Sequence, residues 1–301
     1  MVADLPVLLT IRDPALAAEF AELFAPMADH AGPFVAEIRV EPEPPARPTR
    51  APDEVYEAIS LWRDGDELVV DSGGPLLAHV TATRAIVGGA LGHAPSDNAM
   101  LRRIVHHVIS HILSLNGRLV AHGAAVGRSG GAVLLLGGSG AGKSTSAYLA
   151  SLAGWSLLGD DLIVVRLVDG GVEAIGIHRA VAVPPEVSEA DAAGIELDPR
   201  HRRRPNVELD RRPHRVAAVA LVAHGTGAGS VELARPLDVA GAIVGSTPAG
   251  GNTDVAAAAL RVAGALAAGP CARLCLAEAP ADRLAGTGRL FDEIARLAGL
   301  A

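Results

Sequence analysis

The chain has 301 residues, half of them hydrophobic, and a formal net charge of −8 at pH 7. The acidic total disfavours a broad nucleic-acid-binding surface. The sequence holds no uninterrupted run of about 18 apolar residues, and its start lacks the basic-then-apolar pattern of a signal peptide. We therefore expect a cytoplasmic protein that binds neither nucleic acid nor a membrane.

The length suggests about two domains, and residues 1–95 are expected to form the first as a small α+β domain. Five prolines interrupt residues 41–52 and exclude regular structure there. Asp64-Gly65 lies between two alternating segments and predicts a β-hairpin. The other elements expected in this domain are strands over residues 7–11 and 34–40 and a helix over residues 14–24.

A helix is predicted over residues 97–115, where apolar residues recur at helical spacing until Asn116-Gly117 ends the pattern. We expect it to open the second domain, residues 96–301. The helix carries three histidines, two of which could share a face and suggest a metal site. Since no carboxylate accompanies them, we interpret them as ordinary histidines of the helix surface: His106, His107 and His111.

Residues 137–144 fit the phosphate-binding consensus G-x-x-x-x-G-K-[ST] at every position. The apolar run 132–136 before them predicts a buried strand, and the residues that follow can continue as a helix. Such a loop closes its backbone N–H groups around a phosphate at a helix N-terminus. Lys143 is expected to reach the β- and γ-phosphates, and Ser144 to bind Mg²⁺. The residues expected to hold the nucleotide are Gly138, Ser139, Gly140, Ala141, Gly142, Lys143, Ser144 and Thr145.

Two adjacent carboxylates, Asp160 and Asp161, follow the loop after one short helix and one strand. That distance is compact, and it returns the pair to the phosphate site almost at once. Adjacent side chains at the end of a strand point in different directions. One carboxylate can therefore hold Mg²⁺ while the other faces an acceptor hydroxyl. The sequence does not assign these two roles.

The rest of the second domain predicts a mixed sheet. Turns at residues 127–130 and 168–171 place hairpins on both sides of the phosphate-loop strand, unlike a parallel sheet joined only by helices. Cys271 and Cys275 lack a second pair and are interpreted as buried apolar residues. Further strands are expected over residues 118–126, 216–222, 231–233 and 271–276, and helices over 238–244, 253–266 and 282–297.

His122-Gly123, the phosphate loop and Asp160-Asp161, in this order and spacing, resemble the catalytic domain of HPr kinase/phosphorylase, a P-loop fold related to the phosphoenolpyruvate carboxykinases. Residues 117–126 and 157–161 look like the stand-alone HPr-kinase-like proteins of bacteria. Some of those are lasso-peptide kinases that phosphorylate a serine of a precursor peptide. The resemblance implies an α/β kinase domain with His122 near the transferred phosphate, and with Asp160 and Asp161 sharing the base and Mg²⁺ roles.

Two segments depart from the family or stand outside it. The family's second signature, linked to dephosphorylation, is only echoed by residues 173–179, which end at Arg179. We therefore expect a kinase without phosphorylase activity. A dense basic run over residues 199–205 could bind the nucleotide phosphates or an acidic substrate segment through Arg202, Arg203 and Arg204. A solvated loop is the alternative interpretation of this run.

These observations predict an ATP- and Mg²⁺-dependent kinase whose acceptor is a serine or threonine of a peptide or small protein. A small-molecule hydroxyl kinase is the first alternative, favoured if the groove beside Asp160 is enclosed. A nucleotide-binding regulatory module with slow ATP hydrolysis is the second. The acceptor, the choice between ATP and GTP, and assembly into a homo-oligomer are left open.

Overall fold

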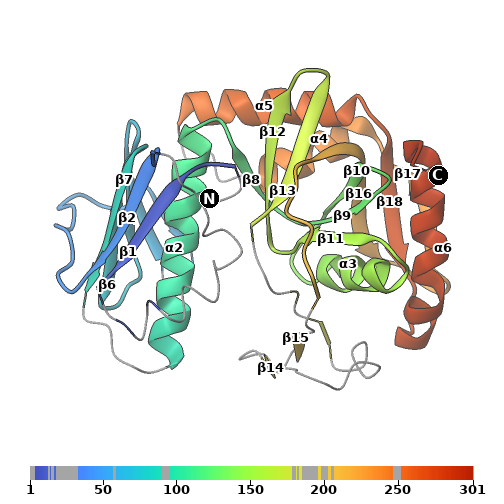
Figure 1. The fold of residues 1–301 in the computed structure, drawn as a ribbon, viewed down its shortest axis with the longest axis horizontal. Coiled ribbons are helices and arrows are strands. Elements are labelled where there is room, and N and C mark those ends of the chain that lie inside the picture. Colours follow the sequence, from blue (N-terminus) through green and yellow to red (C-terminus); the bar gives the residue numbers. More distant parts are fainter. Residues whose placement is uncertain are drawn as a thin grey trace. The chain divides into compact units, whose positions relative to one another are not determined.

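The computed structural model describes residues 4–12, 14, 17, 33–56, 59–89, 95–177, 181, 183–184, 196–197, 203–204, 207–246 and 252–300. The chain divides into two compact units (Figure 1). The first comprises Met1–Leu119 with Ala249–Ala256, and the second comprises Val120–Pro248 with Ala257–Ala301. In the described part of the chain, no helix has the length and apolar character needed to cross a membrane.

The first unit is a seven-stranded sheet, as far as it is described, in the order β1-β2-β7-β6-β5-β4-β3. β1, β2 and β7 pair in parallel, and the strands from β7 to β3 pair antiparallel. The long helix α2 packs against β5, β6 and β7. The elements are β1 (Val7–Ile11), β2 (Ala36–Glu41), β3 (Glu54–Tyr56), β4 (Ile59–Asp64), β5 (Glu67–Asp71), β6 (Leu76–Val80), β7 (Arg84–Gly89) and α2 (Pro95–Leu115).

Most of the predicted elements of this unit are present. The hairpin at Asp64-Gly65 joins β4 to β5, with Gly65 at φ 57°, and residues 42–52 contain neither helix nor strand. The helix expected over residues 14–24 lies almost wholly outside the described residues. β6 and β7 were not predicted. The helix expected to open the second domain packs instead on the first sheet, because its apolar side is buried there.

The histidines of α2 differ from the prediction at one position. His111 is buried rather than on the surface, and its Nε2 lies 2.9 Å from the carbonyl oxygen of Asp66. Burial lowers the pKa of His111 and that of His107. Within the described residues, no cluster of three or more His, Cys, Asp or Glu side chains could hold a metal ion. His111 therefore belongs to the packing of this unit, and His106 and His107 are partly exposed.

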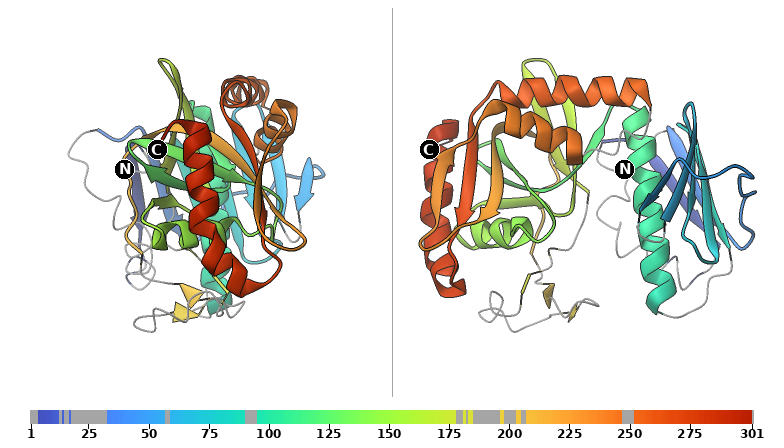
Figure 2. Two further views of the ribbon diagram at one scale, coloured as in Figure 1. Left: turned by 90° about the vertical axis from the view of Figure 1, so that its right-hand side faces the viewer. Right: turned by 180° about the vertical axis from the view of Figure 1, so that it is seen from behind.

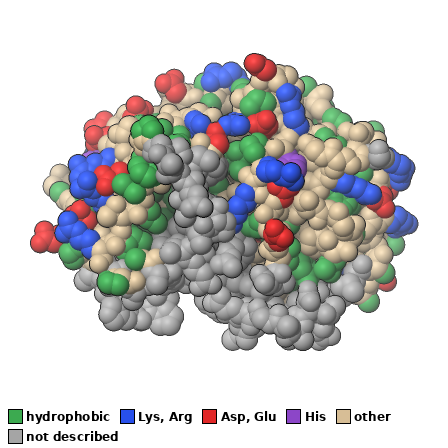
Figure 3. Space-filling model, viewed as in Figure 1, with side chains coloured by type: hydrophobic (Ala, Val, Ile, Leu, Met, Phe, Trp, Pro, Cys, Tyr) green, Lys and Arg blue, Asp and Glu red, His purple; other side chains and the backbone are tan. Residues whose placement is uncertain are grey.

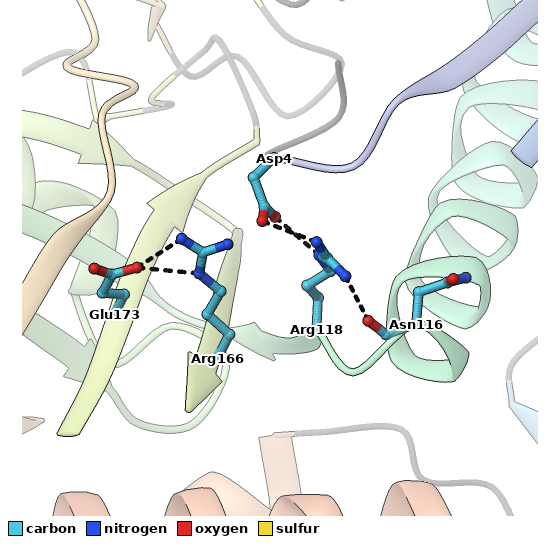
Figure 4. Close-up of polar contacts among 5 residues, drawn as sticks. All are labelled: Asp4, Asn116, Arg118, Arg166 and Glu173. Atoms are coloured by element: carbon cyan, nitrogen blue, oxygen red, sulfur yellow. Dashed lines mark hydrogen bonds and ion pairs between the residues drawn. The ribbon is translucent and has the colours of Figure 1, made fainter. Parts of the chain in front are cut away.

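Each unit contains an ion pair drawn in Figure 4. One joins Asp4 to Arg118, and the other joins Arg166 to Glu173. In the first unit, the guanidinium of Arg118 donates to both carboxylate oxygens of Asp4, at 3.0 and 2.9 Å, and also to the carbonyl oxygen of Asn116. In the second unit, Arg166 and Glu173 face each other, 2.8 Å apart, across the hairpin formed by β12 (Leu162–Val168) and β13 (Gly171–Gly176). On the face drawn in Figure 3, described basic and acidic side chains are interspersed.

The second unit contains a sheet that has nine strands among the described residues. Its main path is β11-β9-β10-β16-β13-β12-β8, and β18 pairs with both β16 and β17. The strands are β8 (Leu119–His122), β9 (Ala124–Arg128), β10 (Gly131–Leu136), β11 (Ser156–Gly159), β12 (Leu162–Val168), β13 (Gly171–Gly176), β16 (His214–His224), β17 (Ser230–Leu233) and β18 (Cys271–Leu276). The helices are α3 (Lys143–Leu152), α4 (Pro236–Ser246), α5 (Thr253–Ala267) and α6 (Pro280–Ala298). Residues 196–197 (β14) and 203–204 (β15) form a separate small hairpin.

β10 lies at the centre of this unit. It pairs antiparallel with β9 and parallel with β16, and all six of its residues are buried. α3 and α6 share one core with the sheet, and α4 packs against β10 and β16 from the other side (Figure 2). A strand covered on both faces reads as a continuous apolar run, as the sequence indicated. Since β10, β16 and β18 are parallel, their carboxyl ends lie at one edge of the sheet.

The α/β architecture with hairpins on both sides of the phosphate-loop strand is confirmed. One predicted element is wrong: residues 118–126 are not one strand but two, β8 and β9, which separate at Gly123. A Cβ atom at Gly123 would lie 2.7 Å from the carbonyl oxygen of Leu135, so the chain passes too close to β10 for a side chain. Cys271 is buried and Cys275 partly buried, and both are free thiols.

Two polar residues, the partly buried Asp210 and the buried His214, fix the start of β16. The carboxylate of Asp210 accepts hydrogen bonds from the side chain and backbone of Arg212 and lies 3.0 Å from Nε2 of His214. The backbone N–H of Asp210 donates to Leu157 at the start of β11. The Arg212 side chain, then its backbone N–H and His214, hold the pKa of Asp210 well below the ordinary value of 3.8.

We expect Asp210→Asn to lower the free energy of unfolding at pH 7 by about 1–2 kcal/mol, because a charge-assisted network is lost. A depressed carboxyl pKa stabilises the fold above the ordinary pKa, and that contribution disappears as the pH falls below it. The loss should therefore shrink between pH 5 and about pH 2, as measured by urea unfolding. As a control, Asp292→Asn, which breaks the exposed pair with Arg128, should cost at most about 1 kcal/mol. Equal losses for the two variants would contradict the role given to Asp210.

Candidate functional site

The loop between β10 and α3 has the strand-loop-helix form that the consensus predicts. Gly142, the residue before the first turn of α3, has φ 98°, a left-handed conformation in which other residues are strained. A Cβ atom at this position would also lie 2.3 Å from Cδ1 of Leu276, at the end of β18. The backbone conformation therefore favours glycine at Gly142, and any side chain there would have to displace the end of the Leu276 side chain.

The loop lysine is buried beneath the loop. Nζ of Lys143 donates to the carbonyl oxygens of Gly137, at 2.9 Å, and Gly138, at 3.0 Å. Burial lowers the pKa of Lys143, and the charges of Asp160 and Asp161 oppose that shift. The cation is thus held at the loop, next to the two acidic residues.

Ser144 and Asp160 meet directly. The Ser144 hydroxyl donates to Oδ1 of Asp160 at 2.8 Å, and the Asp160 carboxylate is buried. A hydroxyl and a carboxylate oxygen so close together are the hard ligands that Mg²⁺ takes from proteins, while it keeps its waters or phosphate oxygens at its other positions. The two residues therefore fit a Mg²⁺ ion that is shared with a nucleotide.

Asp161 turns away from Asp160 and towards β8. It has φ 69°, a left-handed conformation that Asp tolerates better than most residues. Its backbone carbonyl accepts a hydrogen bond from the N–H of Gly123 at 3.2 Å. Nδ1 of His122 lies 3.1 Å from the same carbonyl and 3.0 Å from Oδ1 of Asp161. Since both neighbours are oxygens, Nδ1 is the protonated nitrogen in this arrangement.

The turn that carries the Asp pair is held by a close backbone approach. A Cβ atom at Gly176, in β13, would lie 1.8 Å from the carbonyl oxygen of Leu158, and one at Gly159 would lie 2.8 Å from Cα of Gly176. The last residue of β11 therefore sits directly against β13. This approach fixes the start of the Asp160-Asp161 turn.

The position of His224 at the phosphate loop was not predicted from the sequence. Nε2 of His224 lies 2.8 Å from the carbonyl oxygen of Gly140, although the two residues are 84 positions apart. His224 is the last residue of β16, the parallel neighbour of β10. Its place at the carboxyl end of a predicted strand was the available signal, because such ends meet at one edge of a sheet.

The structure brings together the loop residues, Asp160, Asp161 and His122. Arg203 and Arg204 form the short strand β15, opposite Glu196 and Leu197 of β14. Arg202 and Arg179 lie outside the described residues. Glu173, which begins the segment that echoes the second family signature, is paired with Arg166.

The fold and the site thus define a mixed α/β P-loop domain. No protein-family model matches this chain, and neither does any curated protein. Among solved structures, the Hpr(Ser) kinase/phosphatase from Coxiella burnetii matches over 58% of this chain and 98% of that chain, at 15% sequence identity and a TM-score of 0.28. At such low identity and score the functional proposal rests on the geometry of this chain, and family membership stays a prediction.

Gly142→Ala should destabilise the second unit by about 1–3 kcal/mol, because it combines a left-handed alanine with a contact on Leu276. Gly138→Ala is the matched control in the same loop, since a Cβ atom there meets nothing within 4 Å and its φ is not positive. That variant should stay within about 0.5 kcal/mol of the wild type. Chemical denaturation of the three proteins measures the difference, and a stable Gly142→Ala protein would show that the loop relaxes.

Proposed function

We propose that this protein is an ATP- and Mg²⁺-dependent kinase that transfers the γ-phosphate to a hydroxyl group. The observation that carries the proposal is the meeting of four groups at the carboxyl end of β10. These are the buried ammonium of Lys143, the hydroxyl of Ser144, and the carboxylates of Asp160 and Asp161. His122 lies beside the last of them. A phosphate loop alone predicts nucleotide binding, whereas a second, solvent-accessible carboxylate beside it favours group transfer.

The two carboxylates have different surroundings, and we assign them different roles on that basis. Asp160 is buried and contacts the Ser144 hydroxyl, so these two residues would hold Mg²⁺. Bound there, the ion would neutralise charge that develops on the β- and γ-phosphate oxygens. Lys143 would neutralise charge on the same oxygens after exchanging its contacts with the loop carbonyls.

Asp161 would act as the base. Its side chain is 52% exposed, so an acceptor hydroxyl can reach it from solvent. The acceptor oxygen would bond to the γ-phosphorus while the bond between that phosphorus and the β–γ bridging oxygen breaks, and ADP leaves with the electron pair. The hydroxyl proton passes to Asp161. His122 would orient the Asp161 carboxylate through Nδ1–H, and in its doubly protonated form it would also donate from Nε2 to the transferred phosphate.

A serine or threonine of a peptide or small protein is the acceptor that we favour. The side chains of both His122 and Asp161 are about half exposed, at 49% and 52%. An open site of this kind suits an acceptor carried on a chain better than a metabolite enclosed in a pocket. We further propose that Arg202, Arg203 and Arg204 bind an acidic segment of this substrate, a role open to test by charge reversal.

The direct test is incubation of the purified protein with γ-labelled ATP, Mg²⁺, cell extract and a panel of serine- and threonine-containing peptides. Label on a peptide or protein band should be lost in Lys143→Ala and retained in Asp292→Asn, a matched exposed carboxylate on α6. Label in small molecules alone would identify a metabolite kinase. Release of free phosphate with no labelled acceptor would leave a nucleotide-binding regulator.

The assignment of the two carboxylates predicts a split between binding and chemistry. Asp161→Asn should lower kcat by about 10²–10⁴-fold with little change in the Kd of ATP, because it removes a base. Asparagine also tolerates the left-handed backbone at this position. Asp160→Asn should instead raise the Mg²⁺ concentration needed for half-maximal activity. The assignment fails if the Mg²⁺ requirement shifts in Asp161→Asn and not in Asp160→Asn.

A further inference from the structure

A cavity of about 350 Å³ lies in the second unit, at the same edge of the sheet as the phosphate loop. It is open to solvent on one side and is lined by the turn between β16 and β17, the end of β18 and the first three turns of α6. Its volume falls within the range of about 300–1,000 Å³ that small-molecule sites occupy. None of the groups assigned above to phosphate transfer lines it.

Leu276 connects this cavity to the phosphate loop. Its side chain lines the cavity, and its Cδ1 is the atom that a Cβ at Gly142 would meet at 2.3 Å. The loop glycine and the cavity therefore share Leu276 as a neighbour. A ligand whose phosphates lie in the loop could reach the cavity within the length of a nucleotide.

The sheet order sets the direction in which such a ligand would lie. Asp160 follows β11, which is reached from β10 through β9, whereas the cavity lies at β18, which is reached from β10 through β16. The metal-binding end and the cavity are thus on opposite sides of the phosphate-loop strand. Because the γ-phosphate must lie beside Asp160, the other end of a bound triphosphate points towards β18.

We propose that this cavity is the nucleoside subsite, where the base and ribose of the triphosphate bind. The inference rests on the proposed function, because it requires that the loop bind a nucleoside triphosphate. It goes further by assigning α6 and the end of β18, which carry no recognisable nucleotide motif, to recognition of the nucleoside.

The walls of the cavity suit this ligand. Ala285 supplies exposed apolar surface for the face of a base, and the core residues Leu276 and Leu290 line the floor of the cavity. Arg283 also lines the cavity, and its guanidinium is fixed by hydrogen bonds to the carbonyl oxygens of Ala277, at 2.5 Å, and Glu278, at 3.0 Å. Asp282 is exposed at the start of α6 and can accept hydrogen bonds from ribose hydroxyls or an exocyclic amino group.

Gly286 provides a way to fill the cavity without distorting the fold. It lines the cavity from α6, and a Cβ atom there meets nothing within 4 Å. Gly286→Leu therefore places a side chain in open space, and it replaces glycine by a good helix former. Gly264→Leu is the matched control, because Gly264 lies in α5, has equally open surroundings and does not line the cavity.

The experiment measures the Kd of ATP and of tripolyphosphate, both with Mg²⁺, by titration calorimetry on the wild type and the two variants. We expect Gly286→Leu to weaken ATP binding by about ten-fold or more and to leave tripolyphosphate binding within about two-fold of the wild type. Gly264→Leu should change neither value. Thermal unfolding of both variants checks that the fold is retained.

Three results would overturn the inference. Unchanged ATP binding in Gly286→Leu would place the nucleoside elsewhere. Equal weakening of ATP and tripolyphosphate would show that the variant acts on the loop rather than on a nucleoside site. Wild-type protein that binds the two ligands equally tightly would show that the cavity adds nothing. If the wild type binds neither ligand, it is the proposed function that fails.

Discussion

The backbone carbonyl of Asp161 ties together the segments from which the site is built. It accepts a hydrogen bond from the N–H of Gly123, and it lies within hydrogen-bond distance of Nδ1 of His122. The left-handed conformation of Asp161 directs this carbonyl towards the end of β8, while Asp160 keeps its carboxylate on Ser144. The carboxylate of Asp160 therefore contacts Ser144 and that of Asp161 contacts His122, because Asp161 has a left-handed rather than an extended backbone.

The burial of β10 explains why the other groups gather where they do. A strand with no exposed residue needs cover on both faces and a hydrogen-bonded neighbour at each edge, and here those neighbours are β9 and β16. The parallel neighbour ends beside the phosphate loop, so its last residue, His224, reaches the carbonyl oxygen of Gly140. The next parallel strand, β18, ends at Leu276, whose Cδ1 lies beside Gly142 of the same loop. The carboxyl ends of parallel strands thus supply both supports of the loop.

Local patterns predicted the parts of this protein that depend on neighbouring residues. The phosphate loop, the hairpin at Gly65 and the compact return to Asp160 could be read from the sequence, because turn residues and apolar runs determine them. The break at Gly123 could not, since it depends on the distance from this residue to Leu135 in another strand. The contact of His224 with Gly140 and the burial of His111 likewise depend on pairing between segments that are far apart in the chain.

The hydrogen bonds of Lys143 have a consequence for which anions the loop can hold. The ammonium group already donates to two carbonyl oxygens. An anion can therefore pair with Lys143 only if the lysine breaks or shares these hydrogen bonds. A monovalent anion with a single site of contact offers little in exchange. A polyphosphate can also accept hydrogen bonds from the backbone N–H groups of the loop and of the start of α3. These bonds compensate for the hydrogen bonds that Lys143 gives up. We therefore expect the loop to discriminate by the number of simultaneous contacts, which would make chloride a weak competitor.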